Sequence, residues 1–221
     1  MNFPVNLFSG EWRFAAWIAL SLAWLWAIRS APWKLLTDSV RLNAWGGAIV
    51  VLSLLWSMKA GVQPGLNFHM LGAMVMVLLF GPQLALAALS ITLAAVTANG
   101  DAGWSAYPLN AFVMVIVPVL VAAGVYRLVE QRLPNHFFVY IFVTAFLGSA
   151  VTIGAAGTAA ACLLGAAGVY TAQHLLSDYL TYYVLLAFSE AWLSGMAVTL
   201  MVVYRPGWVV TFDDARYLTN K

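Results

Sequence analysis

The stretch LNAFVMVIVPVLVAAGVYR, from Leu109 to Arg127, decides the class of this protein. It has no charged side chain before its last residue, and it is close to the length of about 20 apolar residues that an α-helix needs to cross a bilayer. The whole chain shares this character, since 63% of its 221 residues are hydrophobic and 8% are charged, against about 25% charged in soluble domains. Long uninterrupted apolar runs favour helices over a barrel, whose strands alternate in polarity. We therefore expect an integral membrane protein of helices.

Polar residues divide the chain into seven apolar segments, which predict one all-α transmembrane domain over residues 1–221, a polytopic helical bundle. The third and fourth segments are short and meet at Gly81-Pro82, a pair that breaks helices. A hairpin that does not reach the far side of the membrane is therefore an alternative for that pair. The predicted helices cover residues 12–29, 44–60, 68–81, 83–98, 109–127, 137–165 and 179–204.

The basic residues predict the orientation, because short cytoplasmic loops are enriched in Lys and Arg. With the N-terminus outside, only Arg13 and Lys59 fall in outer segments. We therefore expect the N-terminus outside and the C-terminus in the cytoplasm, in a multi-pass protein of the bacterial inner membrane that is surrounded by lipid. The inner basic residues are Arg29, Lys34, Arg41, Arg127, Arg132, Arg205, Arg216 and Lys221.

Several classes of function find no support in the sequence. Cys162 is the only cysteine and lies in an apolar stretch, so we expect no disulfide framework, zinc site or redox pair. The formal net charge of +2 is spread out without a basic run, which argues against nucleic acid as a partner. Phosphate-loop, zinc-protease and nucleophile-elbow motifs do not occur, so we do not expect an enzyme.

Polar groups inside membrane spans are costly and are therefore functional candidates. His69 begins the third segment, where a neutral imidazole near the outer surface suits a divalent transition metal, although a capping or interfacial histidine is the alternative. Glu190 lies near the middle of the last segment, and both a structural hydrogen bond and a role in transport are open for it. Asn110 is a second intramembrane polar residue, at the start of the fifth segment.

Two weaker patterns also involve possible metal ligands. His174 and Asp178 share one face at i, i+4 spacing if the last helix starts early, as an outer ligand pair, whereas a solvated loop is the alternative. A set of methionines could hold Cu(I) with thioether sulfur or could simply fill gaps between helices. These methionines are Met58, Met70, Met74, Met76 and Met114.

Small residues recur every four positions on two predicted helices and permit close approach of backbones. Packing within the chain and docking of another subunit are both open for these faces. They are Ala15, Ala19, Ala23 and Ala27 on one helix, and Gly157, Ala161 and Gly165 on the other.

Four blocks in the same order resemble the substrate-capture component of cobalt and nickel uptake systems, the CbiM/NikM family of energy-coupling factor transporters. The family's counterparts begin MHIPDGFLS, continue with HLLG and LGP, then GDGG with a later Asn, and end with GEALxTG and RP. The blocks here are 1–9 (MNFPVNLFS), 68–73 (FHMLGA) with 80–82 (FGP), 100–103 (GDAG) with Asn110, and 189–195 (SEAWLSG) with 205–206 (RP).

The resemblance implies a metal site at the N-terminus. In the family the ion is held by the terminal amine, by the backbone nitrogen and imidazole of a histidine at position two, and by the histidine of the HLLG block. Met1 and His69 match two of these positions, but Asn2 stands in place of the second-position histidine. That change replaces an imidazole with an amide oxygen, a harder and weaker ligand for nickel-like ions.

The leading hypothesis is therefore a substrate-binding component of a transition-metal uptake transporter, with a bound Ni, Co or Cu ion held by Met1, Asn2 and His69. The resemblance also implies a transmembrane coupling subunit and cytoplasmic ATPase subunits as partners. One alternative is a non-transporting membrane subunit with a degenerate metal site that packs in, or helps to assemble, a larger complex. A further alternative is a copper-handling membrane protein.

Overall fold

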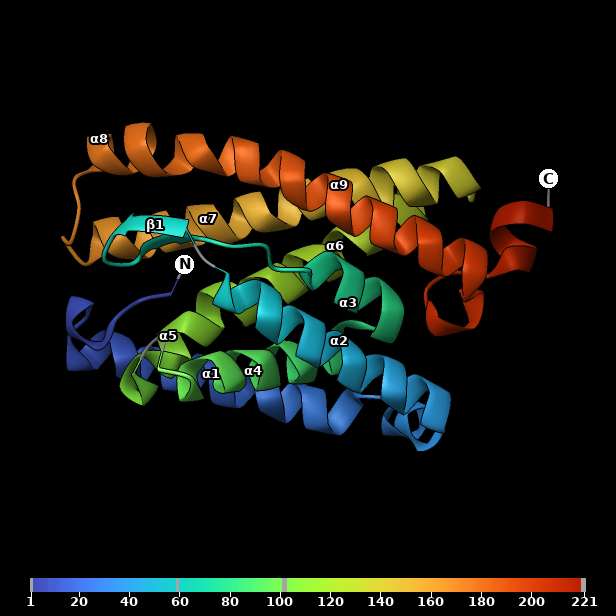
Figure 1. The fold of residues 1–221 in the computed structure, drawn as a ribbon, viewed down its shortest axis with the longest axis horizontal. Helices are drawn as coiled ribbons and strands as arrows, with labels where there is room; N and C mark the ends of the chain where they lie inside the picture. Colours follow the sequence, from blue (N-terminus) through green and yellow to red (C-terminus); the bar gives the residue numbers. More distant parts are fainter. Residues whose placement is uncertain (1, 59, 101–102, 220–221) are drawn as a thin grey trace.

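The computed structural model describes residues 2–58, 60–100 and 103–219, and helices form nearly all of its regular structure (Figure 1). A hairpin of two antiparallel strands, β1 (Ala60–Gln63) and β2 (Leu66–Phe68), follows the second helix. The α-helices are α1 (Gly10–Ser30), α2 (Ser39–Ser57), α3 (Ala73–Phe80), α4 (Pro82–Ala98), α5 (Tyr107–Ala111), α6 (Val117–Arg132), α7 (Gly148–Ala166), α8 (Ala172–His174) and α9 (Thr181–Tyr204).

Short segments of other helix types extend or connect these helices. π-helical segments join α5 to α6 and α8 to α9, and another leads into α7, so that each forms one long continuous helix. They cover Phe112–Ile116, Leu175–Leu180 and Val139–Leu147, and a further one near the C-terminus covers Ala215–Thr219. The 3₁₀ turns are Val5–Leu7, Trp33–Thr37, Trp104–Ala106 and Pro206–Trp208.

Four continuous helices in the described part of the chain are long and apolar enough to cross a membrane. α4 is a shorter apolar helix, and the 21 residues of α1 make it about 32 Å long. The expected class, an all-α membrane bundle, is confirmed by these helices, whereas the number of seven spans and the orientation stay predictions. The four helices are Ser39–Ser57, Trp104–Arg132, Val139–Ala166 and Ala172–Tyr204.

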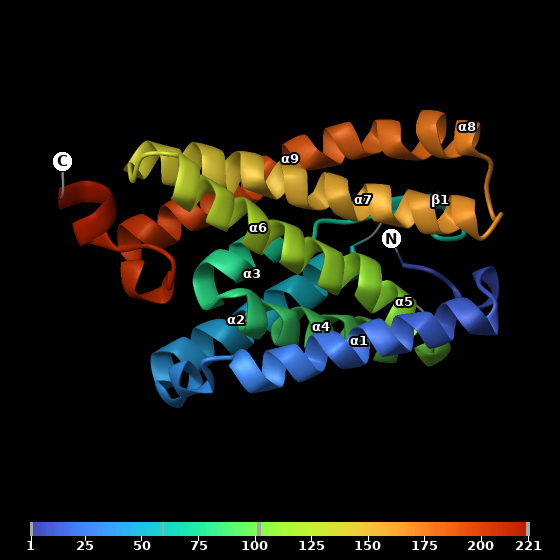
Figure 2. The same ribbon diagram turned by 180° about the vertical axis from the view of Figure 1, so that it is seen from behind.

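The short helix α3 lies at the centre of the bundle. Seven of its eight residues are buried, and it packs against α4, α6, α7 and α9. In Figures 1 and 2, α7 and α9 run along one side of it, and α1, α2 and α4 run along the other. A helix that is apolar all round needs such burial on every face.

The structure differs from the prediction of a helix over 68–81. Residues 60–68 form the β-hairpin, and α3 begins only at Ala73. Pro64 and Gly65 supply the turn, because Gly65 has φ of 82°, the conformation that a type II turn requires. Gly72 then has φ of 67°, which is incompatible with a right-handed helix and delays its start. The predicted helix over 44–60 is also wrong at its end, since α2 stops at Ser57.

Several predicted helices begin earlier than their apolar segments suggest, and two of them begin at a capping side chain. The last one, predicted over 179–204, starts at Ala172, where the side chain of Thr171 caps it by accepting from His174 N–H. α2 starts at Ser39, where the side chain of Asp38 accepts from Val40 N–H. Hydropathy marks the apolar core of a helix, whereas a capping side chain marks where the hydrogen bonds begin.

The C-terminal segment closes the far end of α3. Val210 N–H donates to the carbonyl of Leu79 at 3.1 Å, and the hydroxyl of Thr211 donates to the carbonyl of Leu78 at 2.8 Å, so carbonyls that a helix end leaves open are satisfied. The hydrogen bond with Glu130 raises the pKa of the Arg216 guanidinium and ties this segment to α6.

With eight residues, α3 is about 12 Å long, which is shorter than the hydrocarbon core of a bilayer. This length favours the alternative in which α3 and α4 form a hairpin that does not reach the far side of the membrane.

Candidate metal centre

The N-terminal segment folds back into the end of the bundle at which the β-hairpin lies (Figure 1). Phe3 is completely buried, and its ring centroid lies 5.0 Å from that of Phe8, which is also buried. The ring of Phe8 in turn meets Trp12 of α1 edge-on. These apolar contacts hold the first residues of the chain against the bundle, so that Asn2 too is buried.

Asn110 binds the backbone of this segment. Its Oδ1 accepts from Phe3 N–H at 2.7 Å, and its Nδ2 donates to the carbonyl of Phe3 at 3.2 Å and to Asn2 Oδ1 at 3.0 Å. Asn110 comes from α5 and is fully buried, where a polar group is tolerated only when it is hydrogen-bonded. The fifth helix therefore fixes the position of the N-terminus.

The β-hairpin brings the N-terminal segment beside His69. Asn67 Nδ2 donates to the carbonyl of Asn2 at 3.3 Å, and Asn67 lies two residues before His69. A Cβ on Gly61, its partner across the hairpin, would lie 2.0 Å from Asn67 Oδ1, so only glycine leaves room for this side chain. We name Asn2, Phe3, Asn67 and Asn110 the N-terminal clasp.

His69 is buried, with 3% of its surface exposed. Its Nδ1 lies 3.1 Å from the carbonyl of Met70, and since a carbonyl can only accept, Nδ1 carries the proton and the lone pair of the neutral ring is on Nε2. Histidines that bind metals commonly show this arrangement, in which a backbone carbonyl fixes the tautomer. The ring packs 5.3 Å from that of Trp56 of α2.

Glu190 of α9 holds the backbone that follows His69. Its carboxylate accepts from Leu71 N–H at 3.0 Å and from Gly72 N–H at 2.7 Å, and the hydroxyl of Ser194 lies 3.5 Å away. Trp56 Nε1–H donates to the carbonyl of Leu71 on the same segment. A Cβ on Gly72 would lie 2.5 Å from Leu52 Cδ2, so this segment approaches α2 closely. Glu190 thus holds the backbone directly after His69 in place.

His174 and Asp178 lie on one face of the last helix, 2.8 Å apart between Nδ1 and Oδ2. His174 Nε2 lies 2.9 Å from Oε1 of Gln63 at the end of β1. Both ring nitrogens of His174 are thereby engaged in pinning the hairpin to the helix. The structure brings this pair together with Gln63 and not with the clasp.

A family model described as CbiM, the cobalt uptake substrate-specific transmembrane region, matches residues 2–208. This chain belongs to the CbiM family. Members of the family are parts of transporters, so the chain is a multi-pass membrane component of a metal-uptake transporter and not an enzyme. No curated protein matches the chain.

Two solved structures share the fold of this CbiM protein. A truncated transition metal transporter has a TM-score of 0.78 at 20% identity, over 92% of this chain and 99% of its own. A second transition metal transporter has a TM-score of 0.76 at 21% identity, over 91% of this chain and 92% of its own. The likeness covers nearly the whole chain.

The blocks on which the CbiM resemblance rests meet in space. The first block supplies Asn2, the second His69, the third Asn110 and the fourth Glu190, and the hydrogen bonds above connect the first with the third and the second with the fourth. Met1 lies outside the described residues. Among the described residues, no group of three or more His, Cys, Asp and Glu side chains could hold a metal ion.

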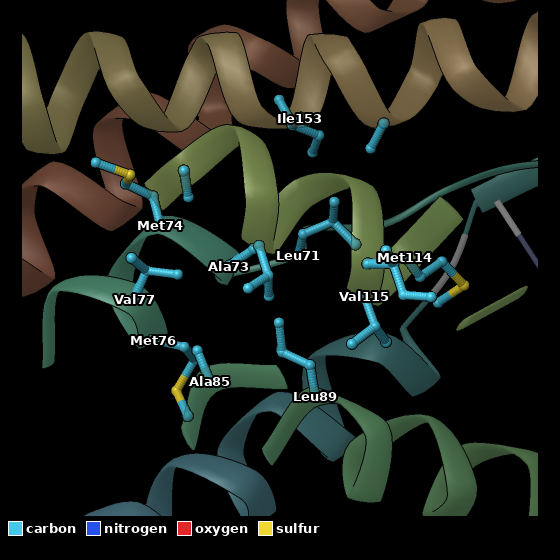
Figure 3. Close-up of a cluster of buried hydrophobic side chains, with 14 of the residues drawn as sticks. Leu71, Ala73, Met74, Met76, Val77, Ala85, Leu89, Met114, Val115 and Ile153 are labelled. Carbon is cyan, nitrogen blue, oxygen red and sulfur yellow. The ribbon is translucent and has the colours of Figure 1, made fainter. Parts of the chain in front are cut away.

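The methionines do not converge on a copper site. Met74, Met76 and Met114 are buried among aliphatic side chains, and Figure 3 shows their sulfur atoms in different parts of that cluster. Met58 is 75% exposed at the end of α2, and Met70 lines a groove between helices. The three buried methionines therefore serve packing in this CbiM protein.

Asn67 and Trp56 connect His69 to the N-terminal segment and to α2, and neither residue was predicted from the sequence to belong to the site. Asn67 stands two residues before His69, and residues i and i+2 share a face of an extended segment. This signal requires an extended chain at 67–69, whereas the apolar pattern predicts a helix over 68–81. Trp56 is one apolar residue among many in the predicted helix over 44–60.

Proposed function

We propose that this chain is the substrate-capture component of a cobalt- or nickel-type uptake transporter and that His69 is the imidazole ligand of the ion. The observation that carries the proposal is the contact between Asn67 and the Asn2 carbonyl, which lies beside a buried histidine whose tautomer leaves Nε2 as the ligand atom. The first block of the family pattern thus meets the chain directly before the second block.

The donor set that we propose is rich in nitrogen. It consists of the α-amino group of Met1, the backbone nitrogen of Asn2 and Nε2 of His69, and such a set suits Ni(II) or Co(II) better than a hard cation. The Asn2 side chain accepts a hydrogen bond from Asn110, so it supports the clasp with the same oxygen that would otherwise face the ion. We therefore expect weaker binding than a second-position histidine would give.

The proposed transporter lies in a bacterial inner membrane. Besides this chain it contains a transmembrane coupling subunit and ATPase subunits on the cytoplasmic side. This sequence contains no phosphate-binding loop motif, so nucleotide hydrolysis would take place on the ATPase subunits. Capture on the outer side and release towards the cytoplasm would then need movement of the segment between β2 and α3, which Glu190 holds.

Calorimetric titration with Ni(II), Co(II), Cu(II) and Zn(II) tests the proposal on the full chain, with an affinity tag at the C-terminus so that the terminal amine stays free. We expect one ion per chain, and His69→Ala should weaken binding about a hundredfold, or about 2.7 kcal/mol. The matched control is His136→Ala, since His136 is only partly buried and follows α6. An absence of binding for all four ions would overturn the metal-capture role.

A second variant tests the departure from the family pattern. Asn2→His adds an imidazole to the proposed set, so Ni(II) affinity should rise about tenfold or more, which is about 1.4 kcal/mol. His174→Ala should leave the affinity unchanged, because His174 is engaged with Asp178 and Gln63. If His174→Ala alone abolishes binding, the ion lies at that pair and the proposed ligand set is wrong.

The hydrogen bond from Asn110 to the Asn2 side chain favours one other function, a membrane subunit that keeps the fold for assembly. In that case the amide at position two stabilises the packing of the N-terminus and binds no ion. Purification from membranes distinguishes the two, since an assembly subunit should retain a stoichiometric partner that lacks ATPase subunits and should bind none of the four ions.

A further inference from the structure

An apolar groove of about 640 Å³ runs between α2 and α9 over the side of α3. Small and flexible side chains line it, among them Gly47 and Ala48 of α2, Ala197 and Met201 of α9, and Leu79 of α3 at its floor. Both flanking helices belong to the spans that are apolar enough to cross a membrane. The groove therefore lies at the depth of lipid chains.

A second hollow, of about 470 Å³, adjoins this groove where α2 begins and α9 ends. Val40 and Trp208 line both hollows, so the two adjoin each other at these side chains. The second hollow contains Arg41 and Arg205, together with Asp38. The apolar groove thus ends at a polar mouth at one face of the bundle.

The mouth has an excess of positive charge. Arg205 is exposed at the end of α9, and Arg41 approaches Asp38 only to 3.9 Å. The carboxylate of Asp38 also accepts from Val40 N–H as the cap of α2, which reduces its share in neutralising the arginines. Two guanidinium groups beside one partly engaged carboxylate favour a phosphate, which arginine can bind through two parallel hydrogen bonds.

We infer that the groove and its mouth together bind one anionic phospholipid, with the phosphate at Arg41 and Arg205 and an acyl chain along the groove. A phospholipid complements both parts at once, since basic pockets between membrane helices bind lipid headgroups while apolar surface takes the chain. A helix from another subunit would fill the groove but would leave the basic mouth without a partner. This inference is independent of metal binding.

Native mass spectrometry of the detergent-solubilised chain measures the binding directly. Phosphatidylglycerol and phosphatidylcholine with identical acyl chains are titrated separately, and glycerol phosphate supplies the headgroup chemistry alone. We expect one phosphatidylglycerol per chain with affinity about tenfold above that of phosphatidylcholine, and no comparable binding of glycerol phosphate. Equal affinity for the two lipids, or full affinity for glycerol phosphate, would overturn the inference.

The arginines are tested by Arg41→Gln combined with Arg205→Gln, which should lower the affinity for phosphatidylglycerol to that for phosphatidylcholine. The matched control is Arg127→Gln combined with Arg132→Gln, since these exposed arginines lie outside both hollows. An equal loss in both double variants would mean that net charge alone attracts the lipid, which contradicts a site at the mouth.

The groove is tested by Gly47→Phe. A Cβ on Gly47 meets nothing within 4 Å, and the same holds for Gly46, but only Gly47 lines the groove. Gly47→Phe should therefore remove both lipids, and Gly46→Phe should remove neither. If Gly47→Phe leaves lipid binding intact but releases a co-purified membrane protein, the groove belongs to that protein and the lipid site is refuted.

Discussion

Asn110 and Glu190 are buried polar residues in membrane spans, and each one binds backbone from a distant part of the chain. Asn110 satisfies both the N–H and the carbonyl of Phe3, and Glu190 satisfies the N–H groups of Leu71 and Gly72. Irregular backbone inside a membrane is tolerated only where protein groups satisfy it. Both residues thus permit non-helical segments at the depth where an ion is proposed to bind.

Asn110→Leu should destabilise the protein because it removes the partner of a buried N–H and a buried carbonyl. An unsatisfied buried group costs about 1–3 kcal/mol, so thermal unfolding in detergent should begin clearly below that of the unmodified chain, and affinity for the ion should fall with it. Asn135→Leu, the same change at an exposed position, is the control. Equal melting of both variants would show that the N-terminal clasp adds no stability.

The long helices pack closely at glycines, because an aromatic ring from a neighbouring helix lies directly against each of them. A Cβ on Gly157 of α7 would lie 2.4 Å from the ring of Tyr183 in α9, and a Cβ on Gly195 of α9 would lie 2.0 Å from the ring of Phe146. Glycine at such interfaces lets helices approach closely. The face that carries Gly157 therefore serves packing within the chain, one of the two alternatives that its spacing left open.

Gly195→Ala should separate α9 from the helix that contains Phe146. Overpacking of this kind costs about 1–3 kcal/mol, although alanine on its own favours a helix. Gly154→Ala is the matched control, because a Cβ on Gly154 of α7 meets nothing within 4 Å. Melting temperatures in detergent should fall for Gly195→Ala and stay equal or rise for Gly154→Ala. The opposite order would mean that Phe146 moves aside at no cost.

At the scale of the whole molecule, the N-terminus, the β-hairpin and the start of α8 lie at one end of the bundle (Figure 1). The C-terminal segment and the loop between α1 and α2 lie at the other end. Two of the basic residues predicted to be cytoplasmic, Arg41 and Arg205, line one hollow at that second end. The distribution of charge therefore predicts which end faces the cytoplasm.

Cysteine labelling in intact cells tests this orientation. In a Cys162→Ala background, Gln173→Cys and Asn135→Cys each place one thiol at an exposed position, the first beside His174 and the second in the loop after α6. A maleimide that cannot cross membranes should label only the former until the cells are broken. Labelling of Asn135→Cys alone in intact cells would reverse the predicted orientation.

The sequence alone determined the class, because burial in a membrane leaves a record in composition and in the length of apolar runs. It also indicated His69, Asn110 and Glu190, since a polar residue in such a run stands out against its neighbours. The proposed metal ligands stay predictions, and one of them, Met1, lies outside the described residues.

Only the tertiary structure decided which of these residues meet and where α3 begins. Asn110 and Asn2 are 108 residues apart, and Glu190 and Gly72 are 118 apart, so no local pattern could pair them. Residues 68–72 are apolar enough for a helix, but the left-handed backbone at Gly72 and the acceptors that Glu190 offers stabilise an extended segment instead. Propensity is a local quantity, and here contacts with α2 and α9 override it.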